Sequence, residues 1–470
     1  QLNSLEQVAD YLSQQTESAE AWSLTASGKV NNSKLAKIGL NNGQEPIHQA
    51  NNATQRQLQV MYGELLSIAP EHISLDANFF ALGGHSILAT QLVNRIKTEL
   101  NKELPLSLLF QLDSLEQVAD YLCEQVEVVD DASNLLKLSQ VNESVEQNKT
   151  VTPASYAQQR LWFSDRLMSG GTQYNIQQGF ELVGSFDLQA IKLALAKTVN
   201  RHKVFACNFA QSEDGLSMVT GNFSDFAATE IDLTNYAAST REDKLKELVE
   251  ADAKHAFDLE QDRLIRAQII KCSAEKAVII LNVHHIIFDG WSLALFFNEF
   301  KVYYNNLVND APIHLPATKA QYHEYARWQK SLGDSGAYTS QQQFWLKQLD
   351  GIPSCHSIPL DFSRPSKACQ AGMAFRTRVS ANTTTKLNHF CDSYGLKPFN
   401  VIQSVFAILL HRFSYEKDIV MGTPVSGRTL AELESVIGMF VNTVTLRTTL
   451  TDGISLLELV RQNQTNFFEV

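Results

Sequence analysis

Two short segments hold the residue types that could do chemistry. In residues 82–87 (LGGHSI) a serine, Ser86, follows two glycines, and in residues 284–290 (HHIIFDG) two histidines precede an aspartate. A serine hydroxyl is a point of covalent attachment, and a histidine side chain can accept or donate a proton near neutral pH. The sequence therefore predicts one site for covalent loading and a second site for acyl transfer.

The serine segment is typical of a turn that opens a helix. Gly83 and Gly84 permit a backbone that most side chains would obstruct, and Ser86 stands where a helical pattern begins. The unpaired N–H groups and partial positive charge of a helix N-terminus would favour a phosphodiester built on Ser86. A serine that only caps the helix is the alternative that these residues leave open.

The histidine segment lies between a predicted strand and a predicted helix. Residues 277–283 are apolar and rich in β-branched side chains, and residues 291–305 show an aromatic-rich helical pattern. In an extended chain the side chains of His284 and His285 point to opposite faces, so only one can easily line a substrate channel. The same geometry disfavours a shared metal ion, and we predict no metal site. A pair of hydrogen-bonded structural histidines is the alternative.

Two further residues of this segment are candidates for the site. Asp289 is expected to pair with a buried cation, and Gly290 is expected to permit a tight turn.

Helical periodicity surrounds the serine. Apolar residues spaced by four indicate one face of a helix that starts near Ser86: Leu88, Leu92, Ile96 and Leu100. Further helices are predicted near residues 55–67 and 114–125, so this part of the chain is expected to be a small helical bundle. Beyond the polar segment 127–149, strands alternate with helices, which indicates an α/β domain.

The serine segment resembles a known family. Residues 76–87 (DANFFALGGHSI) are similar to the motif DxFFxLGGxS of the peptidyl carrier proteins of nonribosomal peptide synthetases. The resemblance implies a four-helix-bundle carrier whose Ser86 holds 4'-phosphopantetheine, transferred from coenzyme A by a phosphopantetheinyl transferase. Ser86 would then anchor a thioester and would not itself attack the substrate.

The histidine segment resembles the condensation domains of the same synthetases. Four motifs occur in the family's order: residues 155–162 (SxAQxRLW), 284–292 (HHxxxDGWS), 322–328 and 437–447. The resemblance implies two chloramphenicol-acetyltransferase-like α/β lobes around a tunnel, where His285 deprotonates or positions the amine that attacks a thioester. It also implies that Asp289 holds the loop through an arginine, which the family motif RHExLRTxF would place at Arg201. This stretch departs from the motif at Lys203 and Ala206, where the family has Glu and Arg.

The resemblances and one internal repeat predict the domain organisation. Residues 1–15 match residues 111–125 at 12 of 15 positions, so the first copy is expected to be a stray carrier helix or an assembly scar. Residues 24–30 (LTASGKV) resemble the closing motif of adenylation domains, with Lys29 as its lysine. The predicted parts are the stray repeat at 1–20, an adenylation tail and linker at 21–50, the carrier at 51–126, a linker at 127–149, and the condensation domain at 150–470, whose second lobe is expected to be incomplete.

These resemblances predict a multidomain enzyme of nonribosomal peptide synthesis. The carrier would tether an aminoacyl or peptidyl thioester, and the condensation domain would join it to an amino acid on a downstream carrier, next to adenylation domains. One alternative is an epimerisation domain, which shares the fold; His85, Trp291 and Ser292 favour condensation instead. A non-catalytic carrier and docking module is the other alternative.

Composition limits the other function classes. A net charge of −12 disfavours nucleic acid and anionic membranes as partners, because both bind basic surfaces. The 470 residues contain no apolar run of about 20 and no signal-peptide pattern at the start, so a cytoplasmic protein is expected. The six cysteines are scattered without a CxxC pair and are expected to be reduced thiols.

Overall fold

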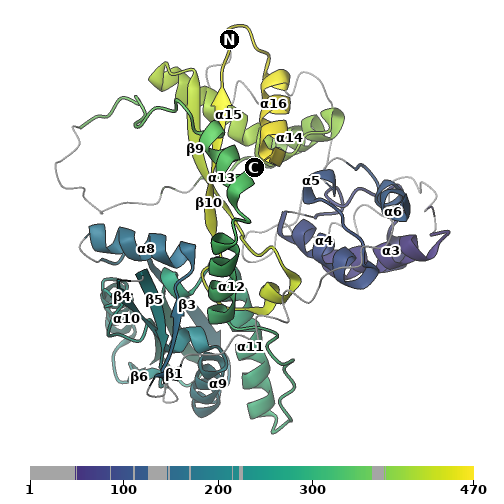
Figure 1. Ribbon diagram of the computed structural model, residues 1–470. Helices are drawn as coiled ribbons and strands as arrows, with labels where there is room; N and C mark the ends of the chain where they lie inside the picture. Colours follow the sequence, from purple (N-terminus) through teal and green to yellow (C-terminus); the bar gives the residue numbers. More distant parts are fainter. Residues whose placement is uncertain are drawn as a thin grey trace. The chain divides into compact units, whose positions relative to one another are not determined.

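The computed structural model describes most of the chain (Figure 1), and the described part divides into two compact units. The described residues are 48, 50–84, 86–109, 112–124, 145–146, 149–168, 171–213, 215–221, 226–362, 375 and 377–469. One unit takes the described residues within 1–129, 344–425 and 443–470, and the other takes those within 130–343 and 426–442. The predicted stray repeat, the predicted adenylation tail with Lys29, and His85 lie outside the described residues.

The carrier segment is a small helical bundle. Its first helix starts after Asn52, which forms a capping box with Gln55. The helices meet around Leu58, Leu92 and Leu122, whose side chains have no exposed surface. The predicted four-helix bundle is confirmed in the described part: α3 (Ala53–Leu66), α4 (Ser86–Leu100), α5 (Leu106–Leu109) and α6 (Leu115–Glu124), with a 3₁₀ turn η2 (Pro70–His72).

A four-stranded sheet in the other unit carries the histidine segment. Its strand order is β3-β8-β7-β6, in which β8 pairs antiparallel with β3 and β7, and β6 joins β7 in parallel. On one face of β8, Ile279, Leu281 and Val283 enter the main apolar core, whereas Ile280 on the other face packs toward α10. The strands are β3 (Asn175–Val183), β6 (Thr229–Asp232), β7 (Ile265–Lys271) and β8 (Lys276–His284), and α10 is Ala238–Ala253.

Helices and a second four-stranded sheet complete this unit. The sheet has the order β1-β2-β5-β4, with β1 at one edge. Its strands are β1 (Val145–Glu146), β2 (Lys149–Pro153), β4 (Cys207–Ser212) and β5 (Gly215–Thr220). The helices are α8 (Tyr156–Leu167), α9 (Leu188–Arg201), α11 (Gly290–Val308) and α12 (Tyr322–Asp334), with 3₁₀ turns η4 (Lys203–Ala206), η5 (His285–Ile287) and η6 (Ala431–Ser435).

A short strand, β1, lies within the segment 127–149 that the sequence predicts as a linker. β1 already pairs with β2 through Val145 and Thr150. An edge strand of two residues needs no apolar run, so its polar sequence gave no strand signal.

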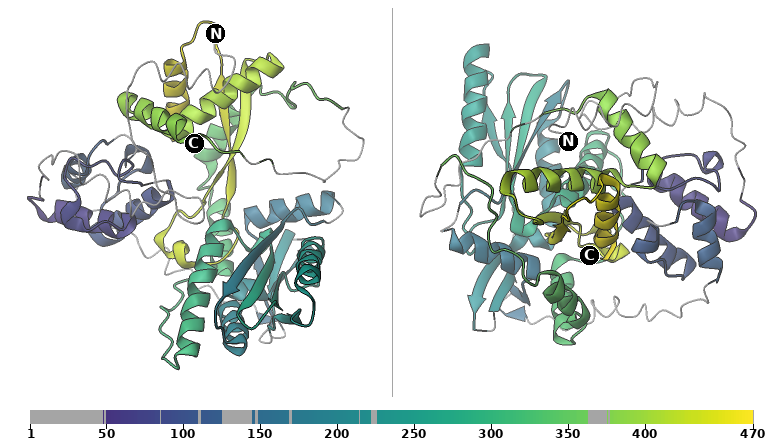
Figure 2. Two further views of the ribbon diagram at one scale, coloured as in Figure 1. Left: turned by 180° about the vertical axis from the view of Figure 1, so that it is seen from behind. Right: turned by 90° about the horizontal axis from the view of Figure 1, so that it is seen from above.

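The rest of the first unit is built on a two-stranded sheet of β9 and β10. Helix α15 packs against β9, α14 and α16, as two further views show (Figure 2). The elements are β9 (Asp418–Val425), β10 (Asn442–Thr449), α14 (Ala381–Tyr394), α15 (Pro398–Ser414) and α16 (Leu456–Glu469). The boundary between the two units falls within α13 (Thr339–Gln348).

Candidate carrier and acyl-transfer sites

A glycine turn places Ser86 at the start of a long helix. Gly83 has a φ of 103°, in the left-handed region that favours glycine. The Gly84 N–H donates to the carbonyl of Phe79 at 3.0 Å, and a Cβ on Gly84 would lie 2.5 Å from the Phe79 ring. Ser86 is the first residue of α4, so the predicted helix start is confirmed.

The N-terminus of α4 fits a phosphodiester on Ser86. Its first turn contains no acidic residue in the described sequence. A helix of 15 residues presents free N–H groups and a partial positive charge at this end, both of which stabilise an anion. These residues could therefore hold the phosphate of a phosphopantetheine arm.

Backbone hydrogen bonds fix the turn that carries the histidines. β8 ends at His284, η5 follows, and α11 begins at Gly290. The His284 N–H donates to the carbonyl of Leu264 at 2.9 Å, and the His285 N–H donates to the carbonyl of Tyr174 at 2.8 Å. The strand, turn and helix predicted around this segment are confirmed.

The two histidines differ in exposure, as their opposite directions predict. His284 is 1% exposed, and its Nδ1 accepts a hydrogen bond from the Ile286 N–H at 3.1 Å. Burial, together with the neighbouring His285, lowers the pKa of His284 to about 3. A neutral imidazole whose Nδ1 is an acceptor carries its proton on Nε2. His284 therefore cannot change its protonation state near neutral pH.

His285 is the accessible member of the pair. Its side chain is only partly buried. Among the described residues its buried Nδ1 has no hydrogen-bond partner. His285 is therefore the histidine that can meet a substrate.

A buried ion pair holds the turn through Asp289. Arg428 Nη2 donates to both oxygens of Asp289, at 3.2 and 3.3 Å, and both side chains are 1% exposed. The same carboxylate accepts from the Phe440 N–H at 3.2 Å and, as the N-cap of α11, from the N–H and Oγ of Ser292 at 2.8 and 2.7 Å. A buried charge is stable only when it is paired and hydrogen-bonded, and these contacts provide both for the Asp289 carboxylate.

The guanidinium of Arg428 is equally enclosed. Its Nη1 donates to the carbonyls of Leu433 and Val436 at 2.5 and 2.6 Å, and its central carbon lies 3.9 Å from the centre of the Phe440 ring. Burial lowers the pKa of Arg428, and Asp289 opposes that effect. Arg428 thus ties residues 428–440 to the histidine turn.

The predicted role of Arg201 is wrong. Arg201 Nε donates to Glu299 Oε1 at 3.1 Å, and its Nη2 donates to the carbonyl of Pro316. His202 Nε2 lies 2.8 Å from the other oxygen of Glu299. Arg201 ends α9, which packs along α11, and the carboxylate that it binds is Glu299 on α11 and not the Asp289 cap. The arginine that pairs with Asp289 is Arg428, which lies 139 residues further along the chain and outside the four sequence motifs.

The backbone at Gly290 does not need the freedom of glycine that the predicted tight turn would use. Gly290 is not among the residues with positive φ, and a Cβ there would meet no atom within 4 Å. The turn before α11 therefore does not require glycine, and the space around the Gly290 Cα is open.

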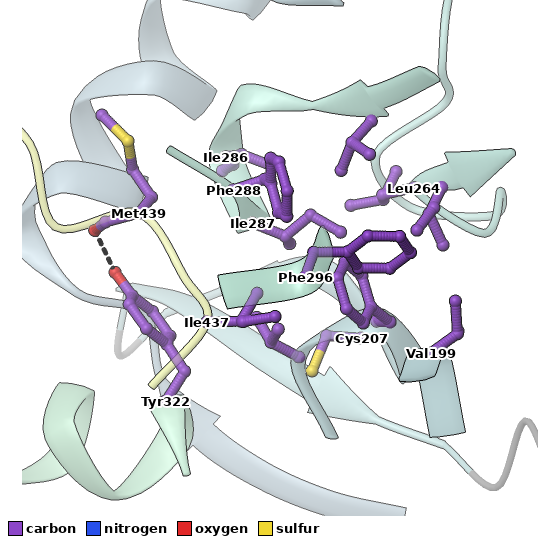
Figure 3. Close-up of a cluster of buried hydrophobic side chains, with 14 of the residues drawn as sticks. Val199, Cys207, Leu264, Ile286, Ile287, Phe288, Phe296, Tyr322, Ile437 and Met439 are labelled. Atoms are coloured by element: carbon purple, nitrogen blue, oxygen red, sulfur yellow. Dashed lines mark hydrogen bonds between the residues drawn. The ribbon is translucent and has the colours of Figure 1, made fainter. Parts of the chain in front are cut away.

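Hydrogen bonds join the four sequence motifs at one place. Gln158 of the first motif donates to the carbonyl of Ile286 at 3.1 Å. Tyr322 of the third motif lies 2.8 Å from Ser155 Oγ and donates to the carbonyl of Met439, in the fourth, at 2.5 Å (Figure 3). The apolar residues of the turn share one cluster with Phe296 in the same view: Ile286, Ile287 and Phe288. The motifs therefore support one structure, the histidine turn.

The predicted fold class and family are confirmed by comparison with known proteins. Residues 148–470 match the family described as Condensation domain, and residues 56–122 match the family described as Phosphopantetheine attachment site. The mixed α/β fold is shared with the X-domain from teicoplanin biosynthesis (TM-score 0.61, 25% identity, 67% of this chain and 70% of that one). It is also shared with the four-domain nonribosomal peptide synthetase AB3403 (TM-score 0.60, 25% identity, 70% of this chain and 25% of that one).

Similar sequences occur in large synthetases. A linear gramicidin synthase of Brevibacillus parabrevis is 30% identical over 96% of this chain, and a plipastatin synthase of Bacillus subtilis (strain 168) is 31% identical over 96%. The chain spans 8% and 17% of the length of these two relatives. In the described part of the chain, no helix has both the length and the hydropathy to cross a membrane. The chain belongs to the condensation-domain family of nonribosomal peptide synthetases and carries a phosphopantetheine attachment domain ahead of its condensation domain.

Proposed function

We propose that the carrier tethers a donor acyl group on Ser86 and that the condensation domain forms an amide bond between such donors and an amino acid on a downstream carrier. The observation that carries the proposal is the contrast within the histidine turn. His284 is buried and neutral, while His285 is partly exposed on a turn fixed by the Asp289–Arg428 pair.

Each site residue has a distinct task in this proposal. Ser86 is the anchor, and the phosphopantetheine bound there supplies the thiol that carries the acyl group as a thioester. The His285 imidazole accepts a hydrogen bond or a proton from the attacking α-amine. Asp289 is a positioning residue, because its carboxylate holds the turn and is itself covered. Gly290 leaves room for the reacting groups.

Tethering explains why one histidine can be sufficient. When two reactants are held near each other, much of the entropic barrier to their encounter is already removed. The partners of the chain are then a phosphopantetheinyl transferase, adjacent adenylation and carrier domains, and aminoacyl or peptidyl thioesters. The cytoplasm is the compartment that we propose, because coenzyme A must be available for loading.

Intact mass tests the anchor. After incubation with coenzyme A and a phosphopantetheinyl transferase, the chain should gain the mass of one phosphopantetheine, and Ser86→Ala should gain none. Ser67→Gly is a matched control, since Ser67 is an exposed serine of the same domain with a φ of 57° that glycine tolerates. An unchanged gain in Ser86→Ala would refute the anchor.

Single-turnover amide formation tests His285. With a donor loaded on the chain and an aminoacyl acceptor on a separate downstream carrier, His285→Ala should lower the rate at least about 100-fold. His314→Ala, which changes an exposed histidine of the same unit, should leave the rate unchanged. Equal rates in wild type and His285→Ala would show that His285 takes no part and would favour a chain that only docks partners.

A further inference from the structure

A buried polar cluster lies under His284, on the face of the sheet that α10 covers. On this face of β8, Ile280 is apolar, but the next two residues in line are Asn282 and His284, which are 0% and 1% exposed. The strand register places Asn175 of β3 directly opposite His284. It also places Gln177 of β3 and Arg266 of β7 on either side of Asn282. Residues that face each other across neighbouring strands have Cβ atoms about 5 Å apart, so these side chains share one space.

Asp252, near the end of α10, is the centre of this cluster. The residue is 5% exposed. Its Oδ1 accepts from Arg266 Nη2 at 3.3 Å and from Gln268 Nε2 at 3.2 Å. Its Oδ2 accepts from Gln177 Nε2 and Asn282 Nδ2, both at 2.9 Å. Four side-chain donors therefore satisfy a carboxylate that would otherwise be costly to bury.

These bonds fix which way each amide faces. Asn282 Nδ2 also donates to the Asp252 carbonyl at 2.8 Å, and Asn175 Nδ2 donates to the carbonyls of Ala253 and His255 at 3.3 and 2.9 Å. A flipped amide would bring oxygen against oxygen at each of these places. The amide oxygens of Asn282, Asn175 and Gln268 therefore face away from the end of α10.

Five polar atoms of the cluster remain buried without a hydrogen-bond partner in the described structure. Three are acceptors, namely Asn175 Oδ1, Gln268 Oε1 and Asn282 Oδ1. The other two are Arg266 Nη1, which is always a donor, and His284 Nε2. His284 Nε2 is also a donor, because the Ile286 N–H occupies Nδ1 of an imidazole that stays neutral. Buried water typically makes about three hydrogen bonds to such groups, and this set offers both kinds of partner.

We propose that this cluster is an internal water site, in which water accepts from His284 Nε2 and donates to the amide oxygens that Asp252 and the end of α10 orient. The water and the amides hold His284 in its Nε2-protonated form. That tautomer leaves Nδ1 free to accept from Ile286, and this bond shapes the turn in which His285 lies. Asp252 is then a positioning residue that acts through Asn282 and His284. The water site rests on the buried polar atoms and the hydrogen bonds that orient them, whereas the effect on amide formation rests on the function proposed for His285.

A crystal structure of the chain together with histidine NMR tests the water site. Ordered density should lie within hydrogen-bonding distance of His284 Nε2 and of at least one amide oxygen of the cluster. In ¹⁵N-histidine-labelled protein, His284 should be neutral and protonated on Nε2 at pH 7. A direct bond from His284 Nε2 to a protein oxygen, no density at the site, or protonation on Nδ1 would each overturn the proposal.

Two variants test the role of Asp252. Asp252→Asn removes the charge that orients the amides, so the His284 Nε2 proton should exchange with solvent at least about tenfold faster. Glu250→Gln is the matched control, since Glu250 lies on the same helix with an exposed side chain, and it should change nothing. If Asp252→Asn does not fold, Asn175→Leu removes the acceptor opposite His284 and should give the same change in exchange. Exchange equal to wild type in the folded variant would overturn the role of the cluster.

Kinetics separate this inference from the proposed function. In the amide-forming assay Asp252→Asn should lower kcat about tenfold while KM for the acceptor and loading of Ser86 stay unchanged. If Asp252→Asn leaves kcat unchanged while His285→Ala is inactive, the positioning role of Asp252 is overturned and the proposed function stays intact. Equal activity of wild type and His285→Ala would instead defeat the proposed function, and the crystal and NMR results would still decide the water site.

Discussion

The serine turn and the histidine turn both precede a long helix, but they are held in different ways. The serine turn is local, because the Gly83 and Gly84 N–H groups donate to the carbonyls of Phe80 and Phe79, and Gly84 packs tightly on the Phe79 ring. The histidine turn depends on distant residues, above all on Arg428, 139 residues along the chain from Asp289.

This difference matches the two proposed tasks. An anchor only has to be reachable by a loading enzyme, so a short segment can specify it. A reacting group has to be held at a fixed position, and buried long-range contacts provide that rigidity. Changes to the distant contacts should therefore harm the histidine turn and leave loading of Ser86 unaffected.

The largest effect is expected from Arg428→Ala. It leaves the Asp289 carboxylate buried without its cation, which costs about 3–5 kcal/mol in the free energy of unfolding. Urea unfolding followed by tryptophan fluorescence measures the loss, since Trp162, Trp291 and Trp328 lie in the same unit. Loading of Ser86 should stay at the wild-type level.

Arg166→Ala is the control for that prediction. Arg166 pairs with Glu260, but both side chains are largely exposed, so the loss should be about 0.5 kcal/mol. If the two arginine variants lost equal stability, the buried pair would not be the clamp that the comparison requires.

A pair of glycine variants tests the contacts among the motifs. A Cβ on Gly438 would lie 1.9 Å from the Tyr322 ring, whereas a Cβ on Gly290 would meet nothing within 4 Å. Gly438→Ala should therefore destabilise the unit by about 3 kcal/mol, and Gly290→Ala by less than about 0.5 kcal/mol. Urea midpoints of the two variants check this order, and the reverse order would contradict the packing described for the fourth motif.

The buried His284 should make stability depend on pH. Its pKa is about 3 in the folded chain and about 6.5 when unfolded, so its contribution is complete above pH 6.5 and is lost as pH falls toward 3. Between pH 7.5 and pH 5 the loss should be about 2 kcal/mol. Urea unfolding of wild type and His284→Gln at both pH values isolates this effect. The same pH dependence in both proteins would mean that His284 titrates normally.

Arg201→Ala should destabilise the chain much less than Arg428→Ala. The side chains of Arg201 and Glu299 are 18% and 15% exposed, and loss of their pair should cost about 1 kcal/mol. Double-mutant cycles should show coupling of Arg201 to Glu299 and none to Asp289. Coupling of more than about 1 kcal/mol to Asp289 would restore the pairing that the sequence motif implied.

The local features of both sites could be predicted from the sequence. Glycines before Ser86 and helical periodicity after it predict the carrier turn, and an extended chain after the β-branched strand predicts that His284 and His285 point to opposite faces. The alternation of side chains along a strand is a property of neighbouring residues, so no distant contact is needed to see it.

Features that depend on distant contacts could not be predicted. Arg428, which pairs with Asp289, belongs to none of the recognised motifs. The family motif instead points to Arg201 as the partner of Asp289, but Arg201 pairs with Glu299. The amides of Asn175, Gln268 and Asn282 are ordinary polar positions in their strands. Only the strand register and α10 bring them together around Asp252.

The central claim is that Ser86 holds the donor and His285 promotes its transfer. The most direct test measures, over time, the fraction of donor acyl groups that remain on the Ser86 peptide after an aminoacyl carrier is added, by mass spectrometry of the quenched and digested chain. The account predicts that the donor leaves the wild-type peptide as amide product forms, and that it stays on the fully loaded peptide of His285→Ala. Loss of the donor from His285→Ala at the wild-type rate, with equal product, would contradict the account.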